Sequence, residues 1–413
     1  MRRSPLLVIL ITVFIDLVGF GIVIPVLPFY AESPEFNASP RAVGLLFASY
    51  SVMQLIFTPV LGRLSDRYGR RPVLLASIIG TGVGFLILGF ATSLWMLFAG
   101  RILDGMTGGN ISTAQAYIAD VTSPQERARG MGLFGAAFGV GFIFGPAVGG
   151  ILSRWGTHAP FFFAATLAFI NALLLYFWLP ETITPDHPAR AAAGGSWAQL
   201  ARLVARAQLA FVLAIYLLFV IAFSMMTTTF ALYTMYRFGY DAQHNGYLFA
   251  FIGIIAVLVQ GGLVGHLAKR YGELSLVIIG APLFALGLFL IPLVGPLSGG
   301  LGALLAVIAV LTLGNSLATP SLTSLASKSA GAGFQGGALG VTQSVASLAR
   351  VIGPLIAAFL IHSATAPEGM DNHTLRLTFW TAAAIMLAAF LLTVYVARAQ
   401  LARSPGAVAT ANN

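Results

Sequence analysis

The sequence contains no cysteine and few charged residues. Without thiols the chain forms no disulfide, no thiolate zinc site, no cysteine-ligated iron–sulfur cluster and no cysteine nucleophile. Only 35 of its 413 residues (8%) are Asp, Glu, Lys or Arg, whereas about a quarter of the residues of a soluble globular protein are charged. The composition therefore excludes an ordinary soluble domain.

Sequence patterns of nucleotide binding and metal catalysis are missing as well. No GxxxxGK[ST] loop is present to hold ATP phosphates, and no HExxH pattern or Cys/His cluster is present to hold a metal. The six histidines are scattered in predicted loops or near the ends of apolar runs. We therefore expect no enzymatic activity, no metal site and no bound cofactor.

Hydrophobic residues make up 58% of the chain and are gathered in long runs. A transmembrane helix needs about 20 mostly apolar residues to cross about 30 Å of hydrocarbon. The runs predict an all-α membrane protein in the lipid bilayer, with twelve spans near residues 6–28, 43–61, 72–92, 94–118, 129–152, 160–179, 209–235, 247–267, 274–294, 299–325, 336–361 and 375–396. The first run has no small-residue cleavage site, so we interpret it as an uncleaved span rather than a signal peptide.

The basic residues lie mainly between the predicted spans and are distributed unevenly. With both termini on one side, that side holds 16 of the 22 Lys and Arg residues, and the opposite side holds four. Because cytoplasmic loops carry the excess of Lys and Arg, we expect both termini in the cytoplasm and a multi-pass protein of the inner (cytoplasmic) membrane. The net charge of +9 forms no single basic patch, so we expect no nucleic-acid partner.

An internal repeat divides the chain into two halves. Residues 62–69 read GRLSDRYG and residues 265–272 read GHLAKRYG, and the Gly145-Pro146 pair recurs as Gly353-Pro354. Such repeats are typical of transporters with a substrate site between their halves. We expect six-helix bundles at residues 1–180 and 208–398, a cytoplasmic linker at 181–207 and a polar tail at 399–413.

Four motifs of the chain resemble those of the major facilitator superfamily, and within it the twelve-helix drug/proton antiporters related to tetracycline efflux pumps. They are DLVGFGIVIPVLP (16–28), GRLSDRYGRR (62–71), RILDGMTGG (101–109) and GAAFGVGFIFGPAVGG (135–150). The resemblance implies two pseudo-symmetric bundles, a proton as the coupling ion, a small-molecule substrate and a monomeric protein.

The third span departs from the tetracycline pumps that the chain resembles. Those pumps carry an acidic residue midway along this helix, whereas this chain has Thr81-Gly82-Val83-Gly84. Conversely, Asp104 stands where those pumps usually have a small residue. Tetracycline itself is therefore not the expected substrate.

Three charged residues inside the N-terminal spans are candidates for proton coupling: Asp16, Arg101 and Asp104. A carboxylate at the depth of Asp16 costs about 3 kcal/mol or more unless it faces protein or water, so it serves either as a proton site or as a hydrogen-bonded orientation device. Arg101 and Asp104 are three residues apart on one helical face. They form either a purely structural ion pair or one that also tunes protonation.

A charged cluster around the loop after the second span is the candidate cytoplasmic gate. Its members are Asp66, Arg67, Arg70, Arg71, Asp120 and Arg129. A charge run is commonly a solvated loop. The family resemblance implies instead that Asp66 caps the eleventh helix near Gly336 and Gly337 while Arg70 pairs with Asp120, which latches the outward-open state.

The fifth span carries the antiporter motif as a series of small residues, with Gly135, Gly139, Gly145, Pro146 and Gly149 as its key positions. Small residues let helices approach closely, and proline removes a backbone donor. We expect a structural role in helix packing and gating.

The candidate substrate cavity combines aromatic and polar residues from both halves: Phe20, Tyr50, Gln54, Asn110, Gln115, Phe230, Tyr233, Asn315, Gln343 and Arg350. An apolar cavity with a few polar groups suits amphipathic organic molecules. Arg350 either attracts an anionic group of the substrate or contacts a backbone carbonyl.

We therefore predict a proton-coupled exporter of small amphipathic molecules. The alternative is proton-coupled uptake of a sugar or an organic acid, which the same fold supports and the fifth-span motif disfavours. A sensor or scaffold that moves no solute is a third class, but it would be expected to carry a large soluble segment, which this sequence lacks.

Overall fold

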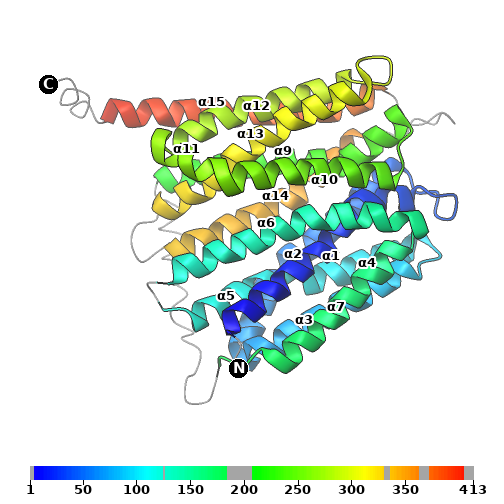
Figure 1. The fold of residues 1–413 in the computed structure, drawn as a ribbon, viewed down its shortest axis with the longest axis vertical. Helices are drawn as coiled ribbons and strands as arrows, with labels where there is room; N and C mark the ends of the chain where they lie inside the picture. The colour runs from blue at the N-terminus through cyan, green and yellow to red at the C-terminus, as the bar shows by residue number, and fades with distance from the viewer. Residues whose placement is uncertain (1–3, 124–125, 184–206, 330–334, 362–371, 404–413) are drawn as a thin grey trace.

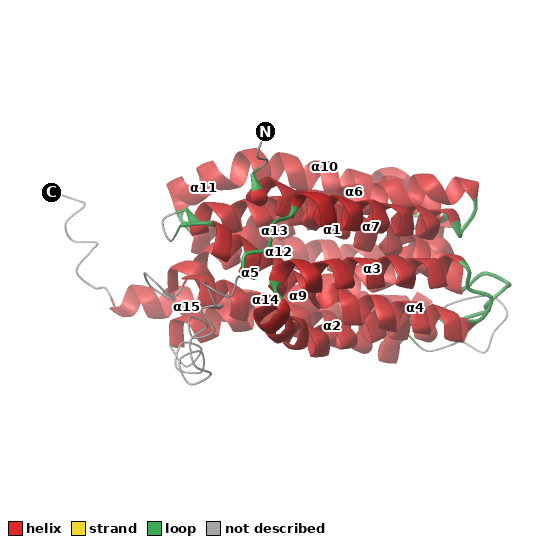
Figure 2. Cartoon of the chain, turned by 90° about the horizontal axis from the view of Figure 1, so that it is seen from below, coloured by secondary structure: helices red, strands yellow, loops and turns green. Residues whose placement is uncertain are grey.

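The computed structural model describes residues 4–123, 126–183, 207–329, 335–361 and 372–403. Within these ranges the chain is almost entirely helical and has no β-strand beyond isolated bridges near Gly295 (Figure 2). The helices of the N-terminal half are α1 (Pro5–Ala31), α2 (Pro40–Tyr68), α3 (Arg70–Gly89), α4 (Leu94–Thr107), α5 (Ile111–Val121), α6 (Arg127–Leu152) and α7 (Ala159–Trp178). The helices of the C-terminal half are α9 (Ala207–Phe238), α10 (Ala242–Leu258), α11 (Val264–Tyr271), α12 (Glu273–Leu290), α13 (Gly300–Ser329), α14 (Gln335–Leu360) and α15 (Asn372–Arg403).

The described helices make the twelve predicted crossings. Eleven of these crossings are formed by single helical stretches that are long and apolar enough to span a bilayer. The fourth crossing is divided into α4, the 3-10 turn Gly108–Asn110 and α5, where the sequence predicted one continuous span. The eighth crossing is also irregular, because a π-helical segment at Val259–Leu263 joins α10 to α11.

Local sequence explains where several helices begin and end. Ser39 precedes α2 and its hydroxyl accepts a hydrogen bond from the backbone N–H of Ala42 at 3.2 Å, while Pro40 occupies the first helical position. Gly69 and Gly272, the last residues of the two repeated motifs, have φ angles of 104° and 81°. Because glycine adopts positive φ without strain, these residues permit the tight turns from α2 to α3 and from α11 to α12.

The two halves lie side by side, and their helices run between two ends of the bundle (Figure 1). We call the end where α1 begins and α15 ends the basic end, because most of the basic residues lie there. Helix α2 packs along α14 and α6 packs along α10, which joins the halves. The halves therefore meet along two pairs of helices.

At the opposite end these helix pairs are in close contact. A Cβ atom added to Gly150 of α6 would lie 2.3 Å from the Cα of Gly246 in α10. A Cβ atom added to Gly44 of α2 would lie 2.7 Å from the Cβ of Ala358 in α14. Only glycine at these positions allows the backbones to approach so closely, so the opposite end is closed.

Toward the basic end, glycines of the fifth, eighth and eleventh crossings have open space beside them. Among the described residues, no atom lies within 4 Å of a Cβ built on Gly135 or Gly139 in α6, or on Gly340 in α14. The same holds for Gly261 and Gly265, next to and within α11. The close contacts between the halves therefore lie toward the opposite end, and small-residue surfaces of α6, α11 and α14 stay uncovered by described residues toward the basic end.

The predicted linker begins with residues that are fixed to the N-terminal half. Glu181 accepts a hydrogen bond from the backbone N–H of Arg70 at the start of α3, and the Thr182 hydroxyl donates to Asp120 of α5 at 3.2 Å. The backbone N–H of Ile183 donates to Glu181. Residues 184–206, which include the rest of the predicted linker, lie outside the described ranges, as do the last ten residues of the predicted tail.

Candidate functional site

A buried ion pair lies at the centre of the N-terminal half. Nη1 of Arg101 donates to Oδ2 of Asp104 at 2.7 Å, and both side chains are at most 4% exposed. The predicted spacing of three residues on one face of α4 is thereby confirmed as an ion pair. A buried pair of this kind keeps each charge compensated in a medium of low dielectric constant.

Tyr50 of α2 connects this pair to its surroundings. The guanidinium of Arg101 lies over the Tyr50 ring, 4.2 Å from its centroid, a cation–π contact. The Tyr50 hydroxyl accepts a hydrogen bond from Nε2 of Gln54 at 2.9 Å, and the ring lies 5.1 Å from that of Phe20. Tyr50 also interacts electrostatically with Asp16, Asp104 and Arg350, so one tyrosine is linked to all the candidate proton-coupling residues and to Arg350.

Glycines in the fourth crossing allow Tyr50 to lie so close. A Cβ atom on Gly105 would lie 2.4 Å from the carbonyl oxygen of Tyr50, and one on Gly108 would lie 2.8 Å from its hydroxyl. Gln54 donates a second hydrogen bond, at 3.0 Å, to the carbonyl oxygen of Gly108. A short 3-10 segment within an α-helix often marks a hinge or a functional position, and here it lies against the ion pair.

Asp16 lies on α1, beside a small pocket of the N-terminal half. Its closest polar partner is Asn110, whose Nδ2 lies 3.5 Å from Oδ2 of Asp16, the outer limit for a hydrogen bond. The pocket has a volume of about 10 Å³, and its lining also includes Thr12, Leu74 and Ala114. This volume is about that of a single water site. Asp16 therefore combines a weak hydrogen bond with room for a water molecule.

Arg350 of α14 is the charged side chain that the C-terminal half places near this cluster. Its Nη2 donates to the Ser347 hydroxyl at 3.3 Å, and its buried Nε has no hydrogen-bond partner among the described residues. Tyr50 and Arg350 each lie ten residues from the opposite end of their helices, a depth of about 15 Å at 1.5 Å per residue. Both therefore lie near the middle of a bilayer about 30 Å thick.

The remaining cavity candidates fall into two groups. Gln115 on α5, Asn315 on α13 and Gln343 on α14 are half-buried, and Asn315 accepts a hydrogen bond from Thr319 at 2.9 Å. Phe230 and Tyr233 are each 1% exposed and lie in a hydrophobic core that includes residues of both halves. The placement of these last two in a cavity is wrong for this conformation, because the Tyr233 hydroxyl is bound to the carbonyls of Ile291 and Val294 at 2.7 and 2.6 Å.

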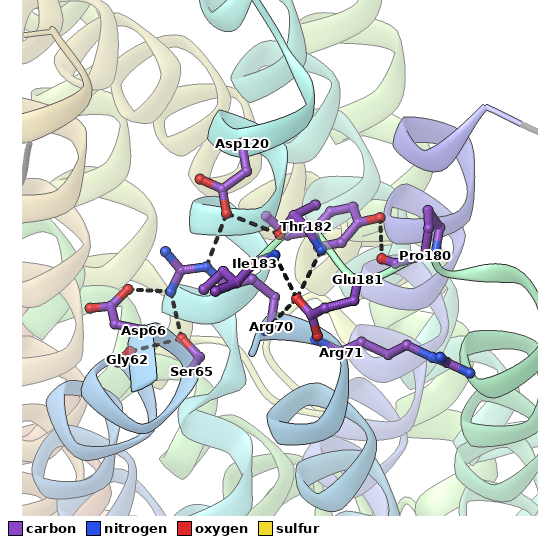
Figure 3. A network of polar contacts seen from close by, with 11 residues as sticks. Gly62, Ser65, Asp66, Arg70, Arg71, Asp120, Pro180, Glu181, Thr182 and Ile183 are labelled. Carbon is purple, nitrogen blue, oxygen red and sulfur yellow. Dashed lines mark hydrogen bonds and ion pairs between the residues drawn. The ribbon is translucent and has the colours of Figure 1, made fainter. Parts of the chain in front are cut away.

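The charged cluster at the basic end is an ordered network, shown in Figure 3. Arg70, the first residue of α3, lies 2.5 Å from Asp66 and 3.1 Å from Asp120. Its Nη1 also donates to the Ser65 hydroxyl at 2.7 Å. The predicted pairing of Arg70 with Asp120 is therefore confirmed, and the guanidinium joins α2, α3 and α5.

Other gate candidates lie outside this network or outside the described side chains. Arg67 is exposed, and its guanidinium lies over the ring of its neighbour Tyr68. The side chain of Arg129 and the surroundings of Gly336 and Gly337 lie outside what the structure describes. In this conformation Asp66 is paired within its own half, so its predicted role as a cap of the eleventh helix stays a prediction for the other state.

Glu181 is a member of the network that the sequence reasoning missed. Its two carboxylate oxygens accept hydrogen bonds from the backbone N–H groups of Arg70 and Arg71, each at 3.0 Å (Figure 3). A carboxylate at a helix N-terminus satisfies free N–H groups and complements the helix dipole. A Cβ on Gly69 would lie 2.5 Å from this carboxylate, so glycine is required there for its approach as well as for the turn.

The C-terminal half holds a charge-reversed counterpart of the Arg70–Asp120 pair. Glu273, the first residue of α12, pairs with Lys328 at the end of α13. Glu273 follows Arg70 by 203 residues and Lys328 follows Asp120 by 208, the two offsets that the repeated motifs show. The sequence contained this signal, because adding 203 to the number of Arg70 and 208 to that of Asp120 gives Glu273 and Lys328.

The glycines of the antiporter motif have two different surroundings. A Cβ on Gly145 would lie 2.6 Å from the Cα of Gly21 in α1, and one on Gly149 would lie 2.6 Å from the carbonyl oxygen of Ile22. Pro146 also lies against Gly21. Gly135 and Gly139, closer to the basic end, have no such neighbour among the described residues. The motif therefore packs α6 on α1 near one end and leaves small surfaces free near the other.

A hydrogen bond joins the two halves across the closed end. The hydroxyl of Tyr236, in α9, donates to Oε2 of Glu32, just after α1, at 2.5 Å, and Oε1 of Glu32 is buried without a partner among the described residues. Burial raises the pKa of Glu32 to about 7, although the hydrogen bond from Tyr236 lowers it. Opening this end would expose the carboxyl group to water.

Two six-helix halves around buried charges near the bilayer centre define a membrane transporter. The sequence profile of the Major Facilitator Superfamily matches residues 9–354. The chain is 33% identical over 399 residues to the class H tetracycline resistance protein of Pasteurella multocida, covering 96% of each chain. It is 29% identical to multidrug resistance protein 2 of Bacillus subtilis, over 87% of this chain and 89% of that one.

A solved structure supports the same relationship. The human organic anion transporter MFSD10 (TETRAN) superposes with a TM-score of 0.68 and 26% sequence identity, covering 95% of this chain and 99% of that chain. The protein belongs to the Major Facilitator Superfamily and is a multi-pass membrane transporter similar to tetracycline and multidrug resistance proteins.

The Arg101–Asp104 pair gives a first prediction. The substitution Arg101→Gln leaves a buried carboxylate without its partner, which should destabilise the folded protein by about 3 to 5 kcal/mol. The double variant Arg101→Gln/Asp104→Asn should recover much of the loss in thermal unfolding measured in detergent. Recovery of stability without recovery of transport would show that the pair also serves transport. If the double variant is no more stable than the single one, the two charges do not stabilise each other.

The contact between Glu32 and Tyr236 predicts a pH dependence of closure. Because the closed-state pKa is about 7 and an exposed glutamate has a pKa near 4.3, protonation favours closure. This stabilisation is complete below about pH 4.3 and is lost as the pH rises through 7. Ala358→Cys in this cysteine-free chain, buried at the closed end, should be labelled by a water-soluble maleimide faster above pH 7 than below it.

The control for this measurement separates gating from thiol chemistry. The labelling rate of Asn37→Cys, which is exposed beside the same end, corrects for the effect of pH on the thiol itself. In a Glu32→Gln background the corrected rate should not vary with pH. A corrected rate that varies equally in both backgrounds would assign the effect to another group.

Proposed function

We propose that the protein exports small amphipathic organic molecules from the cytoplasm in exchange for protons that enter from outside. The observation that carries the proposal is Asp16, a carboxylate within a span that has one long contact to Asn110 and a pocket of about one water beside it. The relatives are tetracycline and multidrug resistance proteins, which supports export of organic compounds.

The distribution of basic residues supports the direction of this exchange. Under the positive-inside rule the basic end faces the cytoplasm, and both termini lie there. We interpret the conformation as inward-open, with the side toward the external medium closed by the contacts of Gly150 and Gly44 and with uncovered glycines toward the cytoplasm. In this state Asp16 releases its proton toward the cytoplasm and substrate enters from the same side.

The network at the basic end supports a latch for the other state. Arg70 and Glu181 hold the start of α3 rigidly against α2 and α5. The carboxylate of Asp66 is 45% exposed, so it is available when the halves close at this end. Asp66 then caps the N-terminus of α14, because a helix N-terminus attracts negative charge, and the outward-open state is latched.

The test is solute-triggered proton movement in proteoliposomes that hold an imposed pH gradient. A panel of amphipathic compounds should include some that dissipate the gradient with wild-type protein, and Asp16→Asn should reduce that response at least about tenfold, because an amide takes up no proton in this range. Asp241→Asn, an exposed aspartate at the N-cap of α10, is the matched control and should behave as wild type.

The direction of solute movement decides between the two transport modes. Solute that moves against the proton identifies an antiporter and supports export. Solute that moves with the proton would replace the proposal by uptake through symport. If Asp16→Asn retains the full proton response, Asp16 is not the coupling site.

A further inference from the structure

The charges near the middle of the membrane are not all compensated. Four charged side chains are involved: Asp16, Arg101, Asp104 and Arg350. Arg101 and Asp104 neutralise each other at 2.7 Å. Among the described residues, neither Asp16 nor Arg350 has an ion-pair partner within 4.0 Å. One acid and one base are therefore left, one in each half.

Arg350 is markedly underbonded for an arginine inside a span. A guanidinium has five N–H donors, and the described contacts of Arg350 supply one hydrogen bond, to Ser347 at 3.3 Å. Its buried Nε has no partner. Because unsatisfied donors inside a membrane protein are costly, this geometry is favourable only if another group binds there during the working cycle.

Asp16 presents the complementary situation in the other half. Its contact with Asn110 is at 3.5 Å, and its side chain is half-buried. Tyr50 interacts electrostatically with both of the uncompensated charges. The ring of Phe20 lies 5.1 Å from that of Tyr50, so the side chain that interacts with both charges belongs to an aromatic pair.

From this arrangement we infer that the transported molecules are zwitterionic amphipaths, with an anionic group that binds Arg350 of the C-terminal half and a cationic group that binds Asp16 of the N-terminal half. The inference rests on the proposed function and names its substrate class. A zwitterion adds no net charge to a site that is neutral when Asp16 is ionised, whereas a simple cation adds a charge that nothing balances.

The same arrangement couples the substrate to the proton. The cationic group of the substrate and a proton compete for the Asp16 carboxylate, as exchange requires. Arg350 stays charged throughout, because a guanidinium is not deprotonated in proteins. Its contact with the anionic group therefore selects the substrate but does not compete with the proton.

Three dyes with similar aromatic bodies test the inference: rhodamine B, a zwitterion at neutral pH, rhodamine B ethyl ester, a cation, and fluorescein, an anion. Binding to the purified full-length protein is measured by fluorescence anisotropy. Wild-type protein should bind rhodamine B at least about tenfold more tightly than the ester. Arg350→Gln should abolish this preference, mainly because it lowers the affinity for rhodamine B. Arg350→Lys should retain part of the preference.

Arg376→Gln, an arginine of α15 away from the cluster, is the matched control and should keep the wild-type preference. Folding of each variant is checked by its thermal unfolding temperature. Asp16→Asn should lower the affinities for rhodamine B and for the ester by similar factors, because both dyes carry the cationic group.

Three results would overturn the inference. In the first, wild-type protein binds the ester or fluorescein as tightly as it binds rhodamine B. In the second, wild-type protein does not bind rhodamine B. In the third, Arg350→Gln lowers the affinity for all three dyes equally. Proton movement triggered by any other solute in proteoliposomes would leave the proposed exchange standing in each of these cases. Absence of such movement with every solute would instead remove the proposed function itself.

Discussion

A charge inside a bilayer must be paired, hydrated or neutralised, and this constraint accounts for most of the arrangement at the centre of the molecule. Arg101 and Asp104 satisfy it by pairing within one helix, 2.7 Å apart and shielded from solvent. Tyr50 adds its ring to the guanidinium, and the glycines of the fourth crossing bring α2 close enough for this contact. The cost of a buried charge thus shapes both the ion pair and the break in α4 next to it.

Polar contacts are distributed differently within each half and between the two halves. Within the N-terminal half, Arg70 and Glu181 tie the starts and ends of helices together with several hydrogen bonds. Between the halves, the contacts of the described residues at the closed end include glycine backbones in van der Waals contact, the guanidinium of Arg41 over the Phe359 ring at 5.4 Å, and a hydrogen bond from Tyr236 to Glu32. Strong polar networks inside each half and modest contacts between halves allow two rigid bodies to rock.

Sequence reasoning succeeded where a local pattern carries the physical cause. Hydrophobic length gave the twelve crossings, and the three-residue spacing gave the Arg101–Asp104 pair. It missed Glu181, because a helix cap supplied from more than a hundred residues away leaves no local pattern. It placed Tyr233 in a cavity, because an aromatic residue in an apolar span has the same signature in a core and in a cavity. The break at Gly108–Asn110 was missed because the glycine pair also fits close packing of a continuous helix.

The central claim is that two rigid halves rock about buried charges, so that one end closes as the other opens. Distances between spin labels measure this directly in the cysteine-free chain, with one pair at Asn37→Cys and Gln243→Cys near the closed end. A second pair at Arg63→Cys and Lys269→Cys reports the basic end. When the pH or the concentration of a transported solute is changed, one distance should lengthen while the other shortens. Distances that change in the same sense, or do not change, would contradict the account.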